Sequence, residues 1–482
     1  MNTKVLKKTA KICKERNIII PTFKQMRNPD LIPQKIKNKL KKTGLWDVDP
    51  VNLFRITWKN NPVENGGDGL YGGVNFLEIP KEITGVKARI VGLVGKFFPT
   101  GAHKVGAAFG CLAPRLVTGE FDPQEQKAVW PSTGNYCRGG AFDSALLGCH
   151  SIAILPEGMS KERFEWLKKV GSEIIATPGT ESNVKEIYDK CWELRKTRKD
   201  VVIFNQFDEF GNPMWHYNVT GPAAREVFDK IKTRNSRLAA FVSATGSAGT
   251  IAAGDYLKSK FPNMKITASE ALQCPTILLN GFGEHRIEGI GDKHIPWVHN
   301  VRNTDLVTAI DDENCMRIIR LFNEKEGLKV LAEYGVKKDI ISKLNLLGIS
   351  GVSNMLSAIK TAKFYELGEN DIVFTVFTDS MELYGSRLKE LEEQFGKYSR
   401  EQALIDMERY LLGVKIDYTK ELGYYDRKAV HNLKYFTWVE QQGKNSDDLR
   451  KLWDPEFWEE KLSQTDKLDK AIEEFNKEAG LV

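Results

Sequence analysis

Short β-rich runs alternate with helical patterns from Arg89 onward, and this order limits the possible folds more than any other feature of the sequence. It is typical of α/β proteins, in which a helix connects one strand to the next parallel strand. Several runs are continuously apolar, as expected of strands covered by helices on both faces. We therefore predict mostly parallel sheets, with strands at Arg89 to Val94, Ala128 to Trp130, Ser151 to Leu155, Val201 to Phe204, Leu238 to Val242 and Ile372 to Phe377.

The two ends of the chain differ from this central part. Residues 1–85 contain a helical stretch and a glycine-rich loop from Asn65 to Gly73, and we interpret them as an N-terminal arm that packs on the rest. After about Leu388, dense alternating charge and many aromatic residues predict a helical C-terminal extension over residues 389–482. Because exposed aromatic residues are costly, we expect this extension to pack against the remainder of the protein.

Charge and cysteine content indicate an intracellular globular protein. The net charge of +6 comes from 70 basic and 64 acidic residues spread along the chain, so we predict no nucleic-acid partner. No apolar run approaches the roughly 20 residues that span a bilayer, and the N-terminus lacks the pattern of a signal peptide. We predict a cytoplasmic protein with no membrane contact and no metal site, because the cysteines are far apart and form no CxxC pair or zinc spacing: Cys13, Cys111, Cys137, Cys149, Cys191, Cys274 and Cys315.

The segment from Phe98 to Gly110 contains the candidate catalytic residue, Lys104. It follows the apolar run at Ile90 to Val94 and leads into a helix of small residues. A partly desolvated lysine amine is a nucleophile that forms Schiff bases with carbonyl compounds and with pyridoxal phosphate. Because most lysines are simply solvated, this segment indicates such chemistry only together with others.

A second segment, Trp130 to Gly140, follows a strand and opens another helix of small residues. Its turn directs backbone N–H groups and hydroxyls at an anion, for which a substrate carboxylate is a plausible guest. An ordinary helix cap and turn is the alternative. The candidate substrate-binding residues of this turn are Ser132, Thr133, Gly134 and Asn135.

A third segment, Ser243 to Gly254, has the composition of a phosphate-binding loop between a strand and a helix. Glycines allow close approach of the backbone, and hydroxyl groups add donors at the positive end of the helix. The loop has no Walker lysine and no dinucleotide fingerprint, which disfavours a nucleotide. The candidate ligands of the phosphate are Gly246, Ser247, Ala248, Gly249 and Thr250.

Together these segments resemble the fold-type II pyridoxal-phosphate enzymes, most closely the cysteine synthase and cystathionine β-synthase branch. The resemblance covers roughly Arg89 to Leu388 and keeps the family's order throughout. It also includes Leu155 to Ser160, Asn205 to Asp208, Gly211 to Pro213, His216 with Tyr217, Thr220 to Pro222, Ile287 to Gly291, Ile295 with Pro296, Glu326 with Gly327, Gly348 to Ser350 and Thr378 to Ser380.

The resemblance implies a two-domain fold like that of tryptophan synthase β chains. In that scheme residues 86–110 and 235–388 form a large cofactor-binding domain, and residues 111–234 form a small mobile domain. Lys104 carries pyridoxal 5′-phosphate as the internal aldimine, and Gly246 to Thr250 hold its phosphate. His103, Asn135 and Gly289 also contact the cofactor, while Ser350 or Ser353 meets the pyridine nitrogen.

The sequence also departs from the cysteine synthases. Gly101 to Lys104 looks more like tryptophan synthase β chains, in which a histidine precedes the lysine. Tyr136, Cys137 and Arg138 replace the small residues expected after the asparagine. We predict that Arg138 reads an additional acidic group on the substrate, since an arginine fork grips carboxylates bidentately. An arginine turned to solvent or paired with an acidic neighbour is the alternative.

The resemblance implies β-replacement or β-elimination on a small L-amino acid such as serine, O-acetylserine or cysteine, through an aminoacrylate. Lys104 removes the α-proton, and a thiol is the second reactant in replacement. A threonine synthase-like reaction, a tryptophan synthase β-like reaction and a deaminating dehydratase remain open. A non-enzymatic binding subunit is disfavoured by the intact Lys104. A homodimer is expected from the family.

Overall fold

Apolar runs form the strands of two separate parallel sheets, each in its own compact unit. The computed structural model describes residues 2–132, 134–159, 161–179, 184–291 and 293–481. The first unit comprises Met1–Val74, Phe97–Ala223 and Asp454–Val482. The second comprises Asn75–Lys96 and Ala224–Trp453. The domain boundaries inferred from the sequence stay predictions.

The first unit contains a parallel sheet in the order β7-β6-β5-β8. The predicted strands in this unit are confirmed, and β7 is an addition. Apolar side chains of the sheet and of helix α8 form one buried cluster, which includes Val129, Ile152 and Cys191. The strands span Lys127–Pro131 (β5), His150–Pro156 (β6), Glu173–Thr177 (β7) and Val201–Ile203 (β8), and a small antiparallel pair joins Asn60–Asn61 (β1) to Leu70–Tyr71 (β2).

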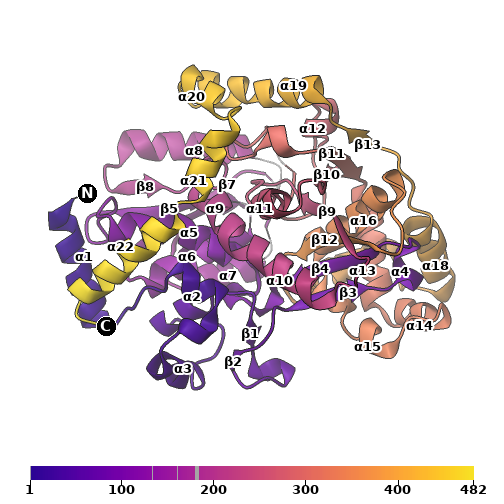
Figure 1. Ribbon diagram of the computed structural model, residues 1–482, viewed down its shortest axis with the longest axis horizontal. Coiled ribbons are helices and arrows are strands. Elements are labelled where there is room, and N and C mark those ends of the chain that lie inside the picture. Colours follow the sequence, from indigo (N-terminus) through magenta and orange to yellow (C-terminus); the bar gives the residue numbers. More distant parts are fainter. Residues whose placement is uncertain (1, 133, 160, 180–183, 292, 482) are drawn as a thin grey trace. The chain divides into compact units, whose positions relative to one another are not determined.

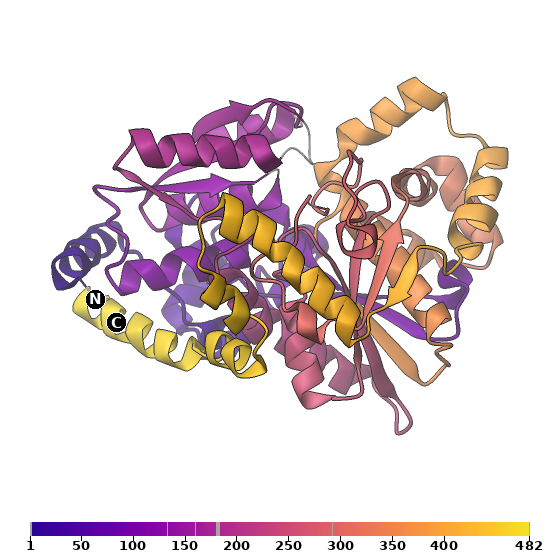
Figure 2. The same ribbon diagram turned by 90° about the horizontal axis from the view of Figure 1, so that it is seen from above.

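Helices from both ends of the chain belong to this unit. Helix α22 packs against α1, α2 and α5, and Figures 1 and 2 show α1 and α22 side by side. The helices are α1 (Thr3–Arg16), α2 (Phe23–Arg27), α3 (Gln34–Leu40), α5 (Lys104–Val117), α6 (Asn135–Leu146), α7 (Lys161–Lys169), α8 (Val184–Thr197), α9 (Gly211–Trp215), the π-helix η6 (His216–Thr220), α21 (Pro455–Leu462) and α22 (Thr465–Glu478).

The second unit contains a larger sheet in the order β13-β11-β10-β9-β12-β4-β3. Its central strands are parallel, and β3 and β13 pair antiparallel at the two edges. The bounds are Phe76–Ile79 (β3), Arg89–Val94 (β4), Arg237–Ala244 (β9), Lys265–Ala271 (β10), Leu306–Ile310 (β11), Asp371–Phe377 (β12) and Thr419–Glu421 (β13). The predicted fold class, mostly parallel sheets covered by helices, is therefore confirmed.

The centre of this sheet is buried on both faces. Strand β12 is buried along its whole length, so its run of apolar residues contacts helices on both faces. Gly92 of β4 leaves room for the ring of Phe377, because a Cβ at Gly92 would lie 2.2 Å from that ring. Helix α16 packs against β12, β9 and β11. Asn354 of α16 accepts from Ala244 N and donates to Val376 O, which ties the ends of β9 and β12 together.

The remaining helices of the second unit surround the sheet and continue into the C-terminal part of the chain. They are α4 (Lys81–Thr84), α10 (Gly221–Ile231, which begins in the first unit), α11 (Ala252–Lys260), α12 (Thr276–Leu279), α13 (Asp312–Asn323), α14 (Lys325–Glu333), α15 (Lys338–Ile341), α16 (Ile349–Phe364), α17 (Gly385–Phe395), α18 (Arg400–Ile405), the π-helix η10 (Asp406–Leu412), α19 (Tyr424–Lys434), the π-helix η11 (Tyr435–Gln441) and α20 (Ser446–Lys451). Within the described ranges, no helix combines the length and apolar content needed to cross a bilayer.

The C-terminal extension packs on both units rather than standing apart from them. In the first unit, Asn218 donates to Leu462 O at 2.6 Å and accepts from Thr465 Oγ1 at 3.0 Å. In the second unit, α18 packs against α14, and η10 packs against α13 and α4. The expectation that the extension is packed is confirmed within each unit.

Candidate active site

The chain makes a strained turn just before Lys104. The short helix η5 (Pro99–Gly101) contains Thr100 at φ 70° and Gly101 at φ 72°, both in the left-handed region. A β-branched residue rarely adopts this conformation, and such strain persists mostly at functional sites. Helix α5 then begins at Lys104, with His103 as its N-cap residue. The side chain of Lys104 is half-buried at the first turn of a helix that is otherwise largely buried.

A buried cluster of rings lies beside Lys104. The His103 ring lies 5.7 Å from the Trp58 ring and 5.0 Å from the His216 ring. Trp58 Nε1 donates to Thr220 Oγ1 at 3.1 Å, which leaves the Thr220 hydroxyl proton for His216 Nδ1 at 3.0 Å. Burial, followed by the charges of His103 and Lys104, holds the pKa of His216 well below its ordinary value. His216 is therefore a neutral imidazole next to the lysine.

Helix α6 packs directly against the start of α5. A Cβ at Gly139 would lie 2.8 Å from Val105 Cα and 3.1 Å from the carbonyl carbon of Lys104. The two helices thus approach through backbone atoms, which only a glycine permits. This contact fixes the turn before α6 relative to Lys104, so the structure brings together the first two predicted segments.

The turn before α6 is organised by Ser132. Its Oγ accepts from Gly134 N at 3.3 Å and from Gln206 Nε2 at 3.2 Å. Asn135 is the first residue of α6, and its Oδ1 is buried. Thr133, predicted to bind substrate, lies outside the described residues. The buried hydroxyl and amide groups match the donor set that the sequence predicts for a carboxylate.

Two residues at this turn were not among the predicted site residues. The guanidinium of buried Arg163 lies beside Gly134, since a Cβ there would be 3.1 Å from Arg163 Nη1. Gln206 contacts Ser132 from a distant part of the sequence. Gln206 lies in a segment that carries the family resemblance, so a signal existed for it. Arg163 lies in a charged helix pattern that gives no indication of burial.

Arg138 lies against two indole rings that contact each other edge to face. Its guanidinium carbon lies 5.0 Å from the Trp166 ring and 5.6 Å from the Trp46 ring. The residue is 5% exposed, so the solvent-facing alternative is wrong. Cation–π contacts of this kind stabilise a desolvated guanidinium. A role for Arg138 in reading an acidic substrate stays a prediction, and packing against the two rings is a second use of the same side chain.

The predicted phosphate-binding loop lies between β9 and α11. Ser247 and Thr250 are buried, and Ala248 has φ 58°, a value that turns the backbone sharply before the helix. A Cβ at Gly246 would lie 3.0 Å from Gly289 O. The loop therefore packs against the Gly289 segment, and the structure brings these two predicted cofactor contacts together within the second unit.

Ser350 and Ser353 both lie in the first turns of α16. They are three residues apart and share one face of the helix. Ser353 is fully buried, and its Oγ lies beside the Cys315 thiol, a weak hydrogen-bonding group, with capacity for a further partner. A buried hydroxyl of this kind is costly unless a ligand satisfies it. Which of the two serines meets a pyridine nitrogen stays open.

Each unit by itself contains residues that suit a part of pyridoxal phosphate. The loop from Gly246 to Thr250 offers buried hydroxyls at the start of α11, which suits a phosphate. Ser353 offers a buried hydroxyl to a ring nitrogen. Lys104, half-buried beside neutral His216, offers an amine to an aldehyde. Lys104 belongs to the first unit, whereas the loop from Gly246 to Thr250 and Ser353 belong to the second.

Comparison with known proteins decides the family. The sequence pattern described as "Pyridoxal-phosphate dependent enzyme" matches residues 95–337, half of the chain. The chain belongs to the pyridoxal-phosphate dependent enzymes. The predicted family, enzyme class and cofactor are thus confirmed.

The relatives agree with this membership. A cysteine synthase of Staphylococcus aureus is 30% identical over 287 residues, which cover 59% of this chain and 84% of that protein. A hydrogen sulfide-producing enzyme of Fusobacterium nucleatum has a similar structure, with a TM-score of 0.54, 24% identity and coverage of 65% of this chain and 97% of that one. An O-acetylserine dependent cystathionine β-synthase of Helicobacter pylori gives a TM-score of 0.54 at 24% identity, covering 65% and 95%. These two structures support the fold.

Proposed function

We propose that this enzyme catalyses β-replacement or β-elimination on a small L-amino acid of the serine, O-acetylserine or cysteine type. The observation that carries the proposal is the buried hydroxyl of Ser353, with Ser350 beside it, where the cofactor ring is expected. A neutral serine, unlike a carboxylate, leaves the ring nitrogen unprotonated. That favours loss of a group from the β-carbon over transamination. The cysteine synthase relative supports the same reaction class.

Each predicted residue has a role in this proposal. Lys104 would hold the cofactor covalently, and its amine, once free, would take the proton from the substrate α-carbon. Ser132, Gly134 and Asn135 orient the substrate carboxylate, and Thr133 is proposed to join them. The bound cofactor supplies a conjugated ring that delocalises the charge left at the α-carbon.

The second unit anchors the cofactor in this proposal. The backbone and hydroxyls from Gly246 to Thr250 bind the phosphate, with Gly289 lining the same region. His103 is proposed to contact the cofactor from the side of Lys104. His216, being neutral, adds no positive charge beside the Lys104 amine. Arg138 is proposed to read an acidic group of the substrate.

The finer assignments follow from the same proposal. A thiol or sulfide serves as second substrate in replacement, which makes the enzyme a transferase; elimination makes it a lyase. We propose a homodimer, as the family resemblance implies. We also propose a cytoplasmic location, since all seven cysteines are free and buried, as expected in a reducing compartment.

Product analysis tests the proposal. The pure protein, loaded with pyridoxal phosphate, is incubated with serine, O-acetylserine, cysteine and threonine, each alone, with a thiol and with indole, and products are identified by mass spectrometry. We expect a thioether with thiol, or pyruvate and ammonia without it, and no product from Lys104→Ala. Turnover of threonine or of an indole instead would favour the threonine synthase-like or tryptophan synthase β-like alternatives.

A further inference from the structure

The C-terminal part of the chain contributes a long helical segment to the second unit, formed by α19 and η11, Tyr424 to Gln441. Figures 1 and 2 show it as one continuous rod. One face is buried and carries Lys434 and Trp438, both fully inaccessible. The opposite face is exposed and carries Tyr425 and Phe436. The segment therefore presents two chemically distinct sides.

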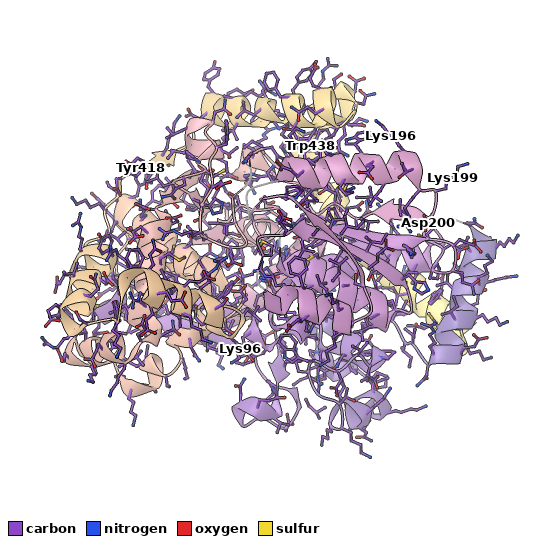
Figure 3. All side chains as sticks on the ribbon, turned by 180° about the vertical axis from the view of Figure 1, so that it is seen from behind. Lys96, Lys196, Lys199, Asp200, Tyr418 and Trp438 are labelled. Carbon is purple, nitrogen blue, oxygen red and sulfur yellow. The ribbon has the colours of Figure 1, made fainter. Side chains whose placement is uncertain are left out.

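The buried side binds the backbone of one loop. Trp438 Nε1 donates to Ile295 O at 2.8 Å. Lys434 Nζ donates to Trp297 O at 2.9 Å and to His299 O at 2.7 Å. Figure 3 labels Trp438 on the inner side of this helix. Three carbonyls within five residues are thus held from a single helix.

The loop that these side chains bind is largely buried, but its described residues form no backbone ladder of their own. Its described residues between Ile287 and His299 form no helix or strand, and Gly289 and Gly291 adopt positive φ. At its beginning, the Glu288 carboxylate accepts from Arg387 Nε at 2.7 Å. Side-chain contacts, rather than a backbone ladder, therefore fix this loop at both ends.

The same loop supports the proposed phosphate site. A Cβ at Gly246 would lie 3.0 Å from Gly289 O and 3.6 Å from Ile290 Cα, so the two backbones are in contact. A displacement of the Gly289 segment would therefore move the loop from Gly246 to Thr250. Because a phosphate is bound through several fixed donors, small shifts of that loop weaken all of them together.

We propose that the α19–η11 segment is a positioning element for the cofactor phosphate site, and that Trp438 and Lys434 are its positioning residues. They act through the loop from Ile287 to His299 and touch neither cofactor nor substrate. The inference rests on the proposed phosphate-binding role of Gly246 to Thr250. The segment lies beyond the family match, which ends at residue 337, so this chain supports a shared site with residues outside the shared region.

Four variants of the full chain test this proposal. Trp438→Phe removes one of the three hydrogen bonds and keeps an aromatic ring, and Lys434→Met removes the other two at similar volume. Phe436→Ala, on the exposed face of the same helix, controls for changes to the helix itself. Leu411→Ala, a fully buried residue of η10, which packs on α13 and α4, controls for a general loss of stability.

The first measurement is hydrogen exchange of the protein without cofactor. We expect amides from 287 to 299, and then those from 246 to 250, to exchange at least tenfold faster in Trp438→Phe and Lys434→Met. Leu411→Ala should lower the melting temperature without this local change, and Phe436→Ala should change neither. Unchanged exchange in both loops for both test variants would overturn the proposal. Should one test variant not fold, the other decides.

The second measurement is the dissociation constant of pyridoxal phosphate, from absorbance titration at a temperature where every variant is folded. We expect about tenfold weaker binding in the two test variants and wild-type affinity in both controls. Equal weakening in Leu411→Ala would reduce Trp438 and Lys434 to a structural role and overturn the proposal. A wild-type protein that binds no pyridoxal phosphate would instead refute the proposed function, and the exchange measurement would still decide whether the helix positions the loop.

Discussion

Replacing Gly139 by alanine tests the close contact between α6 and Lys104. The added Cβ would lie 2.8 Å from Val105 Cα and 2.9 Å from Val105 N, whereas ordinary contacts begin at 3.4 Å. These are backbone atoms that cannot rotate away, so the helices must separate by about 0.6 Å, the difference between 3.4 and 2.8 Å. Such overpacking costs about 1–3 kcal/mol of stability.

The separation also moves the asparagine turn relative to Lys104. Because a 1 Å misplacement of reacting groups costs up to about a hundredfold in rate, we expect Gly139→Ala to lower kcat roughly tenfold. The assay is turnover with the best substrate from the product screen, together with thermal unfolding. Gly385→Ala is the matched control, since no atom lies within 4 Å of its added Cβ. A Gly139→Ala enzyme with wild-type melting temperature and kcat would refute the reasoning.

Three further predictions concern packing, pH and the phosphate loop. Arg138→Met loses two cation–π contacts and should lower the free energy of unfolding in urea by about 2 kcal/mol, and Arg138→Lys should lower it less. Equal stability of the wild type and the two variants would contradict the packing role. Burial lowers the pKa of His294, His299 and His431 to about 3, so these side chains stay neutral in the folded protein above that pH. In the unfolded chain each histidine binds a proton near pH 6.5. Below pH 6.5 the free energy of unfolding should therefore fall by about 1.4 kcal/mol per pH unit for each histidine. Urea unfolding at pH 5, 6 and 7 should show a shallower dependence for His299→Gln, and an identical slope would count against this. Gly249→Asp places an anion in the phosphate loop and should weaken pyridoxal phosphate binding about tenfold or more by fluorescence titration; unchanged affinity would make the loop an ordinary turn.

Apolar runs allowed the sequence to locate six of the strands, namely β4, β5, β6, β8, β9 and β12. The run from Arg89 to Val94 forms β4 with the same bounds, because a strand buried on both faces needs a continuous apolar sequence. Strand β10 was not predicted, since its buried residues include Thr267, Ser269 and Glu270, whose polar groups mask the pattern. Glu270 is accommodated because Ile277 N and Leu278 N donate to its carboxylate.

Contacts between distant segments explain what the sequence did not reveal about the site. Nothing near Trp58 indicates that its ring stacks on His103 or donates to Thr220, because these residues meet only after folding. The aromatic residues of the C-terminal part predicted packing, since their exposure is costly, but not the surface covered. That part is divided between the units, with Asp454–Val482 in the first.

The covalent attachment of the cofactor to Lys104 is the central claim, and borohydride trapping measures it directly. The protein is incubated with pyridoxal phosphate, reduced with borohydride and digested, and the modified peptide is identified by mass spectrometry. Reduction of a Schiff base gives a stable amine, so we predict the pyridoxyl group on the peptide containing Lys104 and none on Lys104→Ala. Labelling of another lysine, or a wild-type protein that gains neither colour nor label, would contradict the account.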